Sequence, residues 1–187
     1  MDFKITPSVN SDHLPEIGKL NPGINIQVVT NLKAGRYFDF RFLPGVSFGQ
    51  RIIHYYNKSD SMLLEPPQSL ESSFLEFPFL LKYKGERLNN VRPYLVGGFN
   101  YRYDLAGKKE YDDEKPVYLR LNRPDLYYEL GAGMDFYLTY FKFSIELKLS
   151  QGIGNVLAGE PHPRYPQYFY AIDKMKSQIW VVSFHFE

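Results

Sequence analysis

The sequence predicts an all-β fold, an eight-stranded antiparallel up-and-down β-barrel that spans a membrane. Three observations predict it. Apolar and polar side chains alternate over most of the chain, long and short connections follow each other in strict order, and 17% of the 187 residues are Phe, Trp or Tyr. The longest apolar run, Phe77–Leu81, is far shorter than the roughly 20 residues of a membrane helix. We expect a single domain over residues 1–187.

Seven segments alternate as strands do, because successive side chains of a strand point to opposite faces. In Phe141–Ser150, Phe, Ile and Leu occupy every second position, with Lys, Ser and Glu between them. Helical periodicity is hard to find. The predicted strands are Ile24–Leu32, Phe38–Phe48, Phe74–Lys84, Tyr94–Tyr103, Tyr127–Leu138, Phe141–Ser150 and Gln178–Glu187.

The connections alternate between long and short without exception. The long ones are Thr6–Gly23, Gly49–Ser73, Asp104–Leu126 and Gln151–Ser177; the short ones are Lys33–Tyr37, Gly85–Arg92 and Thr139–Tyr140. An outer-membrane barrel with long outer loops and short periplasmic turns has this order. Such barrels have an even strand count, so we expect Met1–Ile5 to be a truncated or very short first strand. No apolar stretch follows Met1, so we expect no signal peptide in the chain as given.

Alternation alone does not say which face meets water. A membrane barrel turns its apolar face to lipid, whereas a soluble lipocalin-like barrel turns that face to a ligand. Five glycines share the charged face, where they leave room in a narrow lumen: Gly45, Gly49, Gly98, Gly131 and Gly133. We therefore expect a membrane barrel, with the final strand presenting Trp180, Val182, Phe184 and Phe186 to lipid.

The charged face predicts a salt-bridge network inside the barrel, because an unpaired buried charge costs several kcal/mol. Pro44 and Pro78 predict bulges that shift the alternation and make the facing of Arg51 least secure. An open aqueous pore is not expected, since eight strands enclose little more than side chains. The predicted lumen charges are Asp39, Arg41, Arg51, Glu76, Lys82, Lys84, Arg102, Glu129, Asp135, Lys142, Glu146 and Lys148.

No catalytic or metal-binding motif is found. His13, His54, His162 and His185 show no nucleophile or metal-ligand spacing, and Glu110–Lys115 lacks the spacing of a calcium loop and is read as solvated. The net charge is +1 and cysteine is absent. We expect no catalytic residue, no cofactor, no metal, no nucleic acid and no small-molecule substrate.

Three stretches resemble the PorT family of outer-membrane barrels from Bacteroidota: YFDFRFLPGVSFGQR (Tyr37–Arg51), FLEFPFLLKYKGERLNNVRPYLVGGFNYRYDL (Phe74–Leu105) and YYELGAGMDFYLTYFKFSIELKLSQGIGNVL (Tyr127–Leu157). The resemblance implies a place in the outer membrane of a Gram-negative bacterium. It also implies a role in type IX secretion, which exports proteins with a C-terminal targeting domain, and in gliding motility where the organism glides. It transfers no catalytic residue.

The expected partners are outer-membrane lipid and other proteins of the secretion machine. These proteins would dock on an outer loop such as Pro161–Tyr170 or on a turn such as Gly85–Arg92, and the sequence does not choose between the two. Two other functions stay open. One is a small structural or adhesive barrel without a role in secretion, and the other, less favoured, is a soluble ligand-binding barrel.

Overall fold

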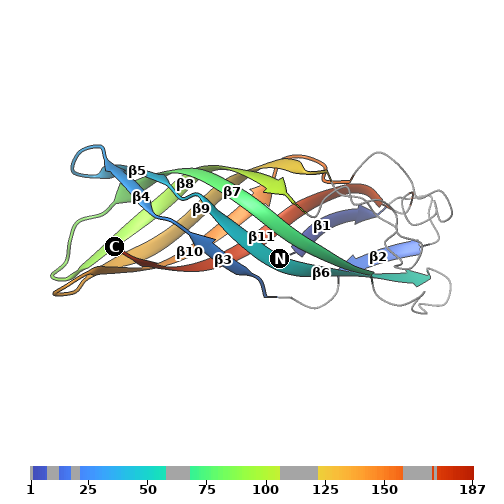
Figure 1. Cartoon of the computed structure of the whole chain (residues 1–187), viewed down its shortest axis with the longest axis horizontal. Coiled ribbons are helices and arrows are strands. Elements are labelled where there is room, and N and C mark those ends of the chain that lie inside the picture. The colour runs from blue at the N-terminus through green and yellow to red at the C-terminus, as the bar shows by residue number, and fades with distance from the viewer. Residues whose placement is uncertain are drawn as a thin grey trace.

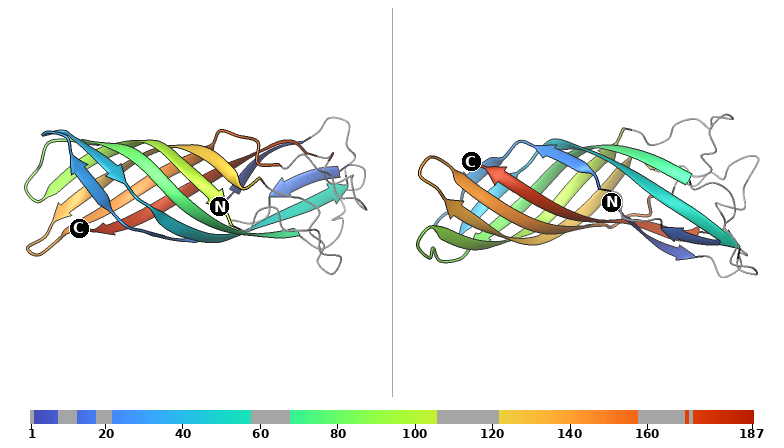
Figure 2. Two further views of the ribbon diagram at one scale, coloured as in Figure 1. Left: turned by 45° about the horizontal axis from the view of Figure 1, so that its top comes forward. Right: turned by 90° about the horizontal axis from the view of Figure 1, so that it is seen from below.

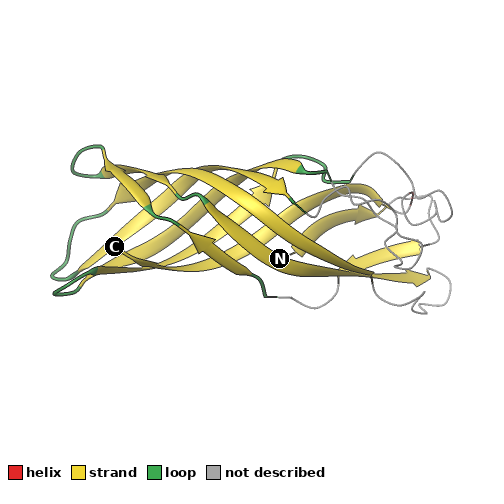
Figure 3. Cartoon of the chain, in the orientation of Figure 1, coloured by secondary structure: helices red, strands yellow, loops and turns green. Residues whose placement is uncertain are grey.

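The computed structural model describes residues 2–7, 13–17, 22–57, 68–105, 122–157, 170 and 172–187. Its strands form one antiparallel sheet that curls into a barrel, with the short turns together at one end (Figure 1 and Figure 3). No helix among the described residues is long and apolar enough to cross a membrane. The strands are β1 (Asp2–Pro7), β2 (His13–Ile17), β3 (Ile24–Gln27), β4 (Thr30–Lys33), β5 (Phe38–Phe42), β6 (Gly45–Asn57), β7 (Gln68–Lys84), β8 (Val91–Asp104), β9 (Pro124–Tyr137), β10 (Lys142–Gly152) and β11 (Ile172–Phe186).

These eleven segments occupy eight positions around the barrel wall. β2, β3 and β4 make one interrupted strand, because β2 and β3 pair with β6 and β4 pairs with β5. β5 and β6 make the next interrupted strand, because both pair with β7. β7 to β11 follow as single strands, and β1 pairs with the far edge of β11. The predicted antiparallel up-and-down barrel is confirmed.

The strands extend further toward the long-loop end than alternation indicates. The β6–β7 ladder continues from Gly49↔Ser72 to Ile53↔Gln68, and β11 begins at Ile172, inside segments predicted as loops. β2 likewise lies within the predicted connection Thr6–Gly23. We attribute the missed extensions to position: beyond the membrane both faces of a strand can be wet, so the sequence no longer alternates there.

The two prolines interrupt one ladder without shifting the alternation. Leu43 and Pro44 separate β5 from β6, and this break lies opposite Phe77 and Pro78 of β7. The predicted shift of parity is wrong, because the register runs from Phe42↔Phe79 to Gly45↔Glu76, an equal step on both strands. Proline thus removes a hydrogen bond but adds no extra residue.

Alternation continues on both sides of this break. Leu43, Ser47, Glu76 and Leu80 are all buried, and Pro78 pairs with Asn100 inside an unbroken β7–β8 ladder. The side chain of Arg51 lies outside the described residues, so its facing stays a prediction.

The two faces of the wall are inverted relative to a soluble protein. The outward face carries large apolar side chains, among them Leu95, Leu130, Phe79 and Trp180, which are 58–61% exposed. The inward face carries charged side chains, most of them under 3% exposed. A surface this apolar marks contact with lipid or protein.

One line along the wall lacks a backbone ladder, and we call it the seam. Its edges are β3–β4 on one side and Ile179–Phe186 of β11 on the other. Among the described residues, β1 pairs with β11 only as far as Gln178, and β3 and β4 pair only with β6 and β5. β4 and β11 run parallel, so an antiparallel ladder cannot join them directly (the blue and red edges at the right of Figure 2).

Candidate functional site: the charged lumen

Ten predicted lumen charges lie buried inside the barrel, and they come from β5, β7, β8, β9 and β10. Each sits at an inward position of its strand, because alternate residues of every strand face the same side. The ten are Asp39, Arg41, Glu76, Lys82, Lys84, Arg102, Glu129, Asp135, Glu146 and Lys148. Lys142 is placed differently: its side chain is 22% exposed at the turn end, where its ammonium lies 2.6 Å from Glu187.

Near the short turns, two ion pairs join strands: Lys82 of β7 reaches across β8 to Asp135 of β9, and Lys84 of β7 meets Asp39 of the neighbouring β5. The Lys82 ammonium lies 2.7 Å from the Asp135 carboxylate, which also accepts a hydrogen bond from Ser144 Oγ at 2.7 Å. Lys84 pairs with Asp39 at the rim. Each charge therefore meets its opposite at hydrogen-bond distance.

The centre of the lumen is organised around Glu146. Its carboxylate lies 2.9 Å from the Arg41 guanidinium and accepts a hydrogen bond from the Tyr94 hydroxyl at 2.9 Å. Lys148 and His185 approach its other oxygen at 3.7 Å. With its side chain fully buried, Glu146 depends on these groups to offset the cost of desolvation.

Toward the outer end, Arg102 links two carboxylates. It lies 3.1 Å from Glu76 and 3.4 Å from Glu129, and Lys148 lies 3.1 Å from the second Glu129 oxygen. Neutral side chains complete the acceptors: Asn25, Gln27 and Ser47 donate to Glu76, and Asn100 and Ser150 donate to Glu129. The charges thus form a connected chain that crosses the lumen.

Small residues make room for this packing. A Cβ on Gly133 would lie 2.5 Å from the Tyr94 hydroxyl oxygen, and one on Gly131 would lie 2.6 Å from Lys148 Cγ. Both contacts are shorter than real side chains allow. The Tyr94 ring can therefore lie across the lumen, where the Lys82 ammonium sits 3.6 Å from its centre.

Sequence reasoning missed several members of the network. Tyr94 and His185 occupy inward positions by simple alternation, but a search for lumen charges does not predict them because their side chains carry no fixed charge. The sequence predicts Glu187 only as the end of the last strand, but its carboxylate lies 2.7 Å from the Arg41 guanidinium. Burial opposes ionisation of Glu187, but the hydrogen bond from Lys142 and the charge of Arg41 outweigh it, so its pKa lies below its ordinary value.

The outer end of the lumen is apolar instead. Val156, Leu157, Ile172, Met175 and Ile179 are buried there. The segment after β10 folds over them, held by Asn155, whose side-chain oxygen accepts the N–H groups of Leu157 and Met175 at 3.2 and 3.1 Å. The sequence missed this cap because it lies in a segment predicted to be a loop.

Two hollows follow the seam. One of about 430 Å³ reaches from Gly23 and Asn25 to Glu76 and His185. The other, of about 420 Å³, lies between Asn31 and the end of β11. Polar lumen side chains therefore border the place where the backbone ladder is missing.

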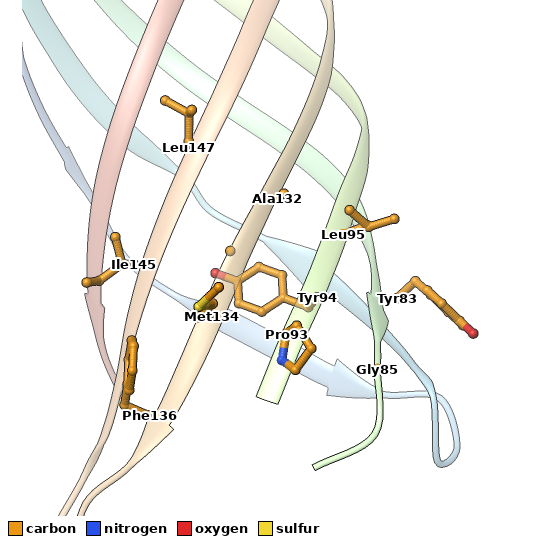
Figure 4. Close-up of a pocket in the computed structure, with 11 residues that line it drawn as sticks. Tyr83, Gly85, Pro93, Tyr94, Leu95, Ala132, Met134, Phe136, Ile145 and Leu147 are labelled. Carbon is orange, nitrogen blue, oxygen red and sulfur yellow. The ribbon is translucent and has the colours of Figure 1, made fainter. Parts of the chain in front are cut away.

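A third hollow, of about 560 Å³, lies on the outward face of β8 to β10 (Figure 4). Ala132 forms its floor between the larger Leu95 and Leu147, its register partners on either side. Its lining is mostly apolar, and apart from Tyr94 and Gly133, which face the lumen, it belongs to the lipid-facing surface.

The final strand points outward as expected, with Trp180, Val182 and Phe184 each 60% exposed and Phe186 68%. Several sites named from the sequence lie outside the described residues: His162, Glu110–Lys115, the predicted docking loop Pro161–Tyr170 except for Tyr170, and the side chain of His13. Within the described part, no group of three His, Asp or Glu side chains is placed to hold a metal ion.

A curled antiparallel wall, apolar outside and charged inside, defines the class of outer-membrane β-barrels. The chain belongs to the outer membrane protein beta-barrel domain family, whose model matches residues 3–158. It therefore resides in the outer membrane of a Gram-negative bacterium. No curated protein and no solved structure matches the chain.

Proposed function

We propose that this barrel is a non-catalytic component of the type IX secretion machinery. It acts as a scaffold or assembly factor that is required for export of proteins bearing a C-terminal targeting domain. Its partners are other proteins of the machine together with outer-membrane lipid, and in an organism that glides it also supports gliding.

The observation that carries the scaffold role is the filled lumen. Arg41, Arg102, Glu129 and Glu146 are each no more than 2% exposed and are paired with one another or with neighbouring charges. Side chains packed in this way favour a rigid wall over a water-filled passage. A barrel of this kind contributes through its outer surface and its ends.

The machine is suggested by the resemblance to the PorT family. Its three stretches correspond to β5–β6, to the hairpin β7–β8 with its turn, and to β9–β10 with the cap that follows. They therefore include parts of the wall, two short turns and the closure of the outer end.

The test is deletion of the gene in the native host, followed by quantification of proteins with the type IX C-terminal domain in medium and periplasm. We expect these proteins to accumulate in the periplasm and to disappear from the medium. The intact gene should restore export, and so should a variant with His13→Ala, His54→Ala and His162→Ala, because no chemistry is assigned to these side chains.

Normal export in the deletion strain would overturn the proposal and leave a structural or adhesive barrel. Failure of the triple histidine variant, with normal amounts in the outer membrane, would overturn the non-catalytic part alone.

A further inference from the structure

The turn between β7 and β8 is a rigid tip. Leu88 and Val91 exchange two backbone hydrogen bonds of 2.9 Å, which closes a two-residue turn in which Asn89 has a φ of 52°. Arg87 braces it by donating to the Asn89 carbonyl at 2.7 Å. Leu88 nevertheless projects from the tip with 71% of its surface exposed.

The turn between β9 and β10 lies beside it. Leu138 and Phe141 close this turn through a backbone hydrogen bond of 3.0 Å, and Tyr140 at its tip is 95% exposed. The two turns are joined, because Tyr137 N–H donates to the Asn90 carbonyl at 2.8 Å and the Arg87 guanidinium stacks 4.1 Å from the Tyr137 ring. They form one surface at the turn end of the barrel (Figures 1 and 2).

Arg92 ties a third turn to this surface. Its guanidinium donates to the carbonyl of Gly85 at 2.8 Å and to the carbonyl of Arg36 at 3.0 Å. Arg36 lies between β4 and β5, so the ends of three neighbouring hairpins are held together. The surface is therefore preorganised for contact.

The charge of this surface is positive and uncompensated. Among the described residues, Lys33, Arg36, Arg87 and Arg92 take part in none of the ion pairs, and Glu86 is the one acid on these turns that is also unpaired. The other carboxylates at this end, those of Asp39, Asp135 and Glu187, are already neutralised by lumen cations. An excess of arginine next to exposed Leu and Tyr is typical of a protein interface.

We propose that Arg36, Arg87, Leu88, Leu138 and Tyr140 form a docking surface for an acidic, partly apolar face of a periplasmic protein of the secretion machine. This inference rests on the proposed function and deepens it, since it assigns docking to the short turns. The tips project along the barrel axis, away from the side of the wall that lipid surrounds (Figure 1). Charge complementarity with an acidic protein therefore explains them better than contact with lipid headgroups.

The test uses the full chain in the native host. The double variant Arg36→Glu, Arg87→Glu should lower type IX export roughly tenfold, because reversed charges repel an acidic partner. The matched control Lys174→Glu, Lys176→Glu reverses two exposed cations of β11 toward the opposite end and should export normally. A heat-modifiable band of unchanged amount in outer-membrane fractions shows that each variant still folds.

Rescue identifies the partner surface. A photo-crosslinking amino acid at Leu88 should capture one periplasmic or periplasm-facing protein, and the capture should be lost in the charge-reversed variant. Lysine substitutions at the acidic residues of that protein nearest the crosslink should restore export to the Arg→Glu variant but not to the deletion strain. This outcome would establish direct charge pairing.

Three results would overturn the inference. Normal export by the charge-reversed variant, in a host where deletion abolishes export, would refute the docking surface and leave the proposed function standing. A crosslink to lipid alone would identify headgroups as the partner. Headgroups would also be identified if the charge-reversed variant had an export defect and inserted less well into phosphatidylcholine vesicles that contain phosphatidylglycerol than into vesicles that lack it.

Discussion

Two parts of the barrel wall are held together by different forces. From β7 to β11, continuous antiparallel ladders join every neighbouring pair of strands. At the seam, no described backbone pairing joins β3 and β4 to β11, and side chains make the connection instead. Asn31 and Arg41 both reach Glu187 across this line.

The difference shows what the lumen network does in each place. In the continuous wall, backbone hydrogen bonds already fix the strands, so buried ion pairs mainly satisfy one another. At the seam, unpaired backbone edges would be costly in hydrocarbon, where water cannot satisfy them. Side-chain pairs at the seam therefore carry a larger share of the local order.

The largest effect is expected where the wall and network depend on a single carboxylate. Glu146→Gln leaves Arg41, Lys148 and His185 facing a neutral group in a buried site. We expect the free energy of unfolding to fall by about 3–5 kcal/mol. Urea unfolding of the barrel in lipid vesicles, followed by fluorescence of Trp180, the single tryptophan, measures it.

The control for this change is Glu86→Gln, which removes an exposed, unpaired carboxylate from a turn. It should shift the unfolding free energy by less than about 0.5 kcal/mol. Equal losses in the two variants would show that the network adds nothing beyond surface charge.

The second effect tests packing on the two faces of one strand. Gly133→Val points into the lumen against the Tyr94 ring and should cost about 1–3 kcal/mol by overpacking. Ala132→Val, one residue earlier, points into the lipid-facing hollow and should be close to neutral. The same urea unfolding compares them, and a larger loss for Ala132→Val would reverse the facing assigned to β9.

The third effect is specific to the seam and depends on pH. The pKa of Glu187 is lowered in the folded barrel, so its contribution is present above the ordinary carboxyl pKa of about 4.3 and is lost as pH falls through the lower folded value. At pH 7, Glu187→Gln should lower the unfolding free energy by about 1 kcal/mol. The gap between wild type and variant should close below about pH 4. A gap that stays constant with pH would exclude the ion pairs as its cause.

The part of this architecture that could be predicted follows from the membrane. Lipid requires one face of each strand to be apolar, so the outward facing of Phe79, Leu130 and Trp180 can be predicted from their side chains. The inward facing of Glu76 and Glu146 then follows from alternation. Where lipid is absent the signal fails. β2, the outer half of β6 and the start of β11 carry no alternation, and the apolar cap of Val156 and Leu157 lies in a segment that sequence could only read as a connection.

Pairing inside the lumen was harder to predict than facing. Alternation places Arg41 inside, but its partners depend on how the strands stagger around a closed wall. That stagger brings Arg41 to Glu146, which is 105 positions away in the sequence, and to Glu187, which is 146 positions away. The prediction that prolines shift the alternation was wrong for a related reason. It correctly marks the lost hydrogen bond at Pro44 and Pro78, but only the register shows that both strands advance by the same number of residues.

The smallest expected effect on stability comes from introduced cysteine pairs, which compare how closely the strands approach in the continuous wall and at the seam. The chain has no cysteine, so introduced pairs report without background. Ala132→Cys with Leu147→Cys joins register partners of the continuous wall and should oxidise readily, because such partners lie about 4.5–5.5 Å apart. Ile26→Cys with Val182→Cys puts one thiol on each edge of the seam and should stay reduced in membranes, while a longer bifunctional thiol reagent should bridge the two. Both pairs should leave the unfolding free energy nearly unchanged under reducing conditions. Rapid oxidation of the seam pair would mean that its edges meet in the membrane, and the contrast between backbone-held wall and side-chain-held seam would then be lost.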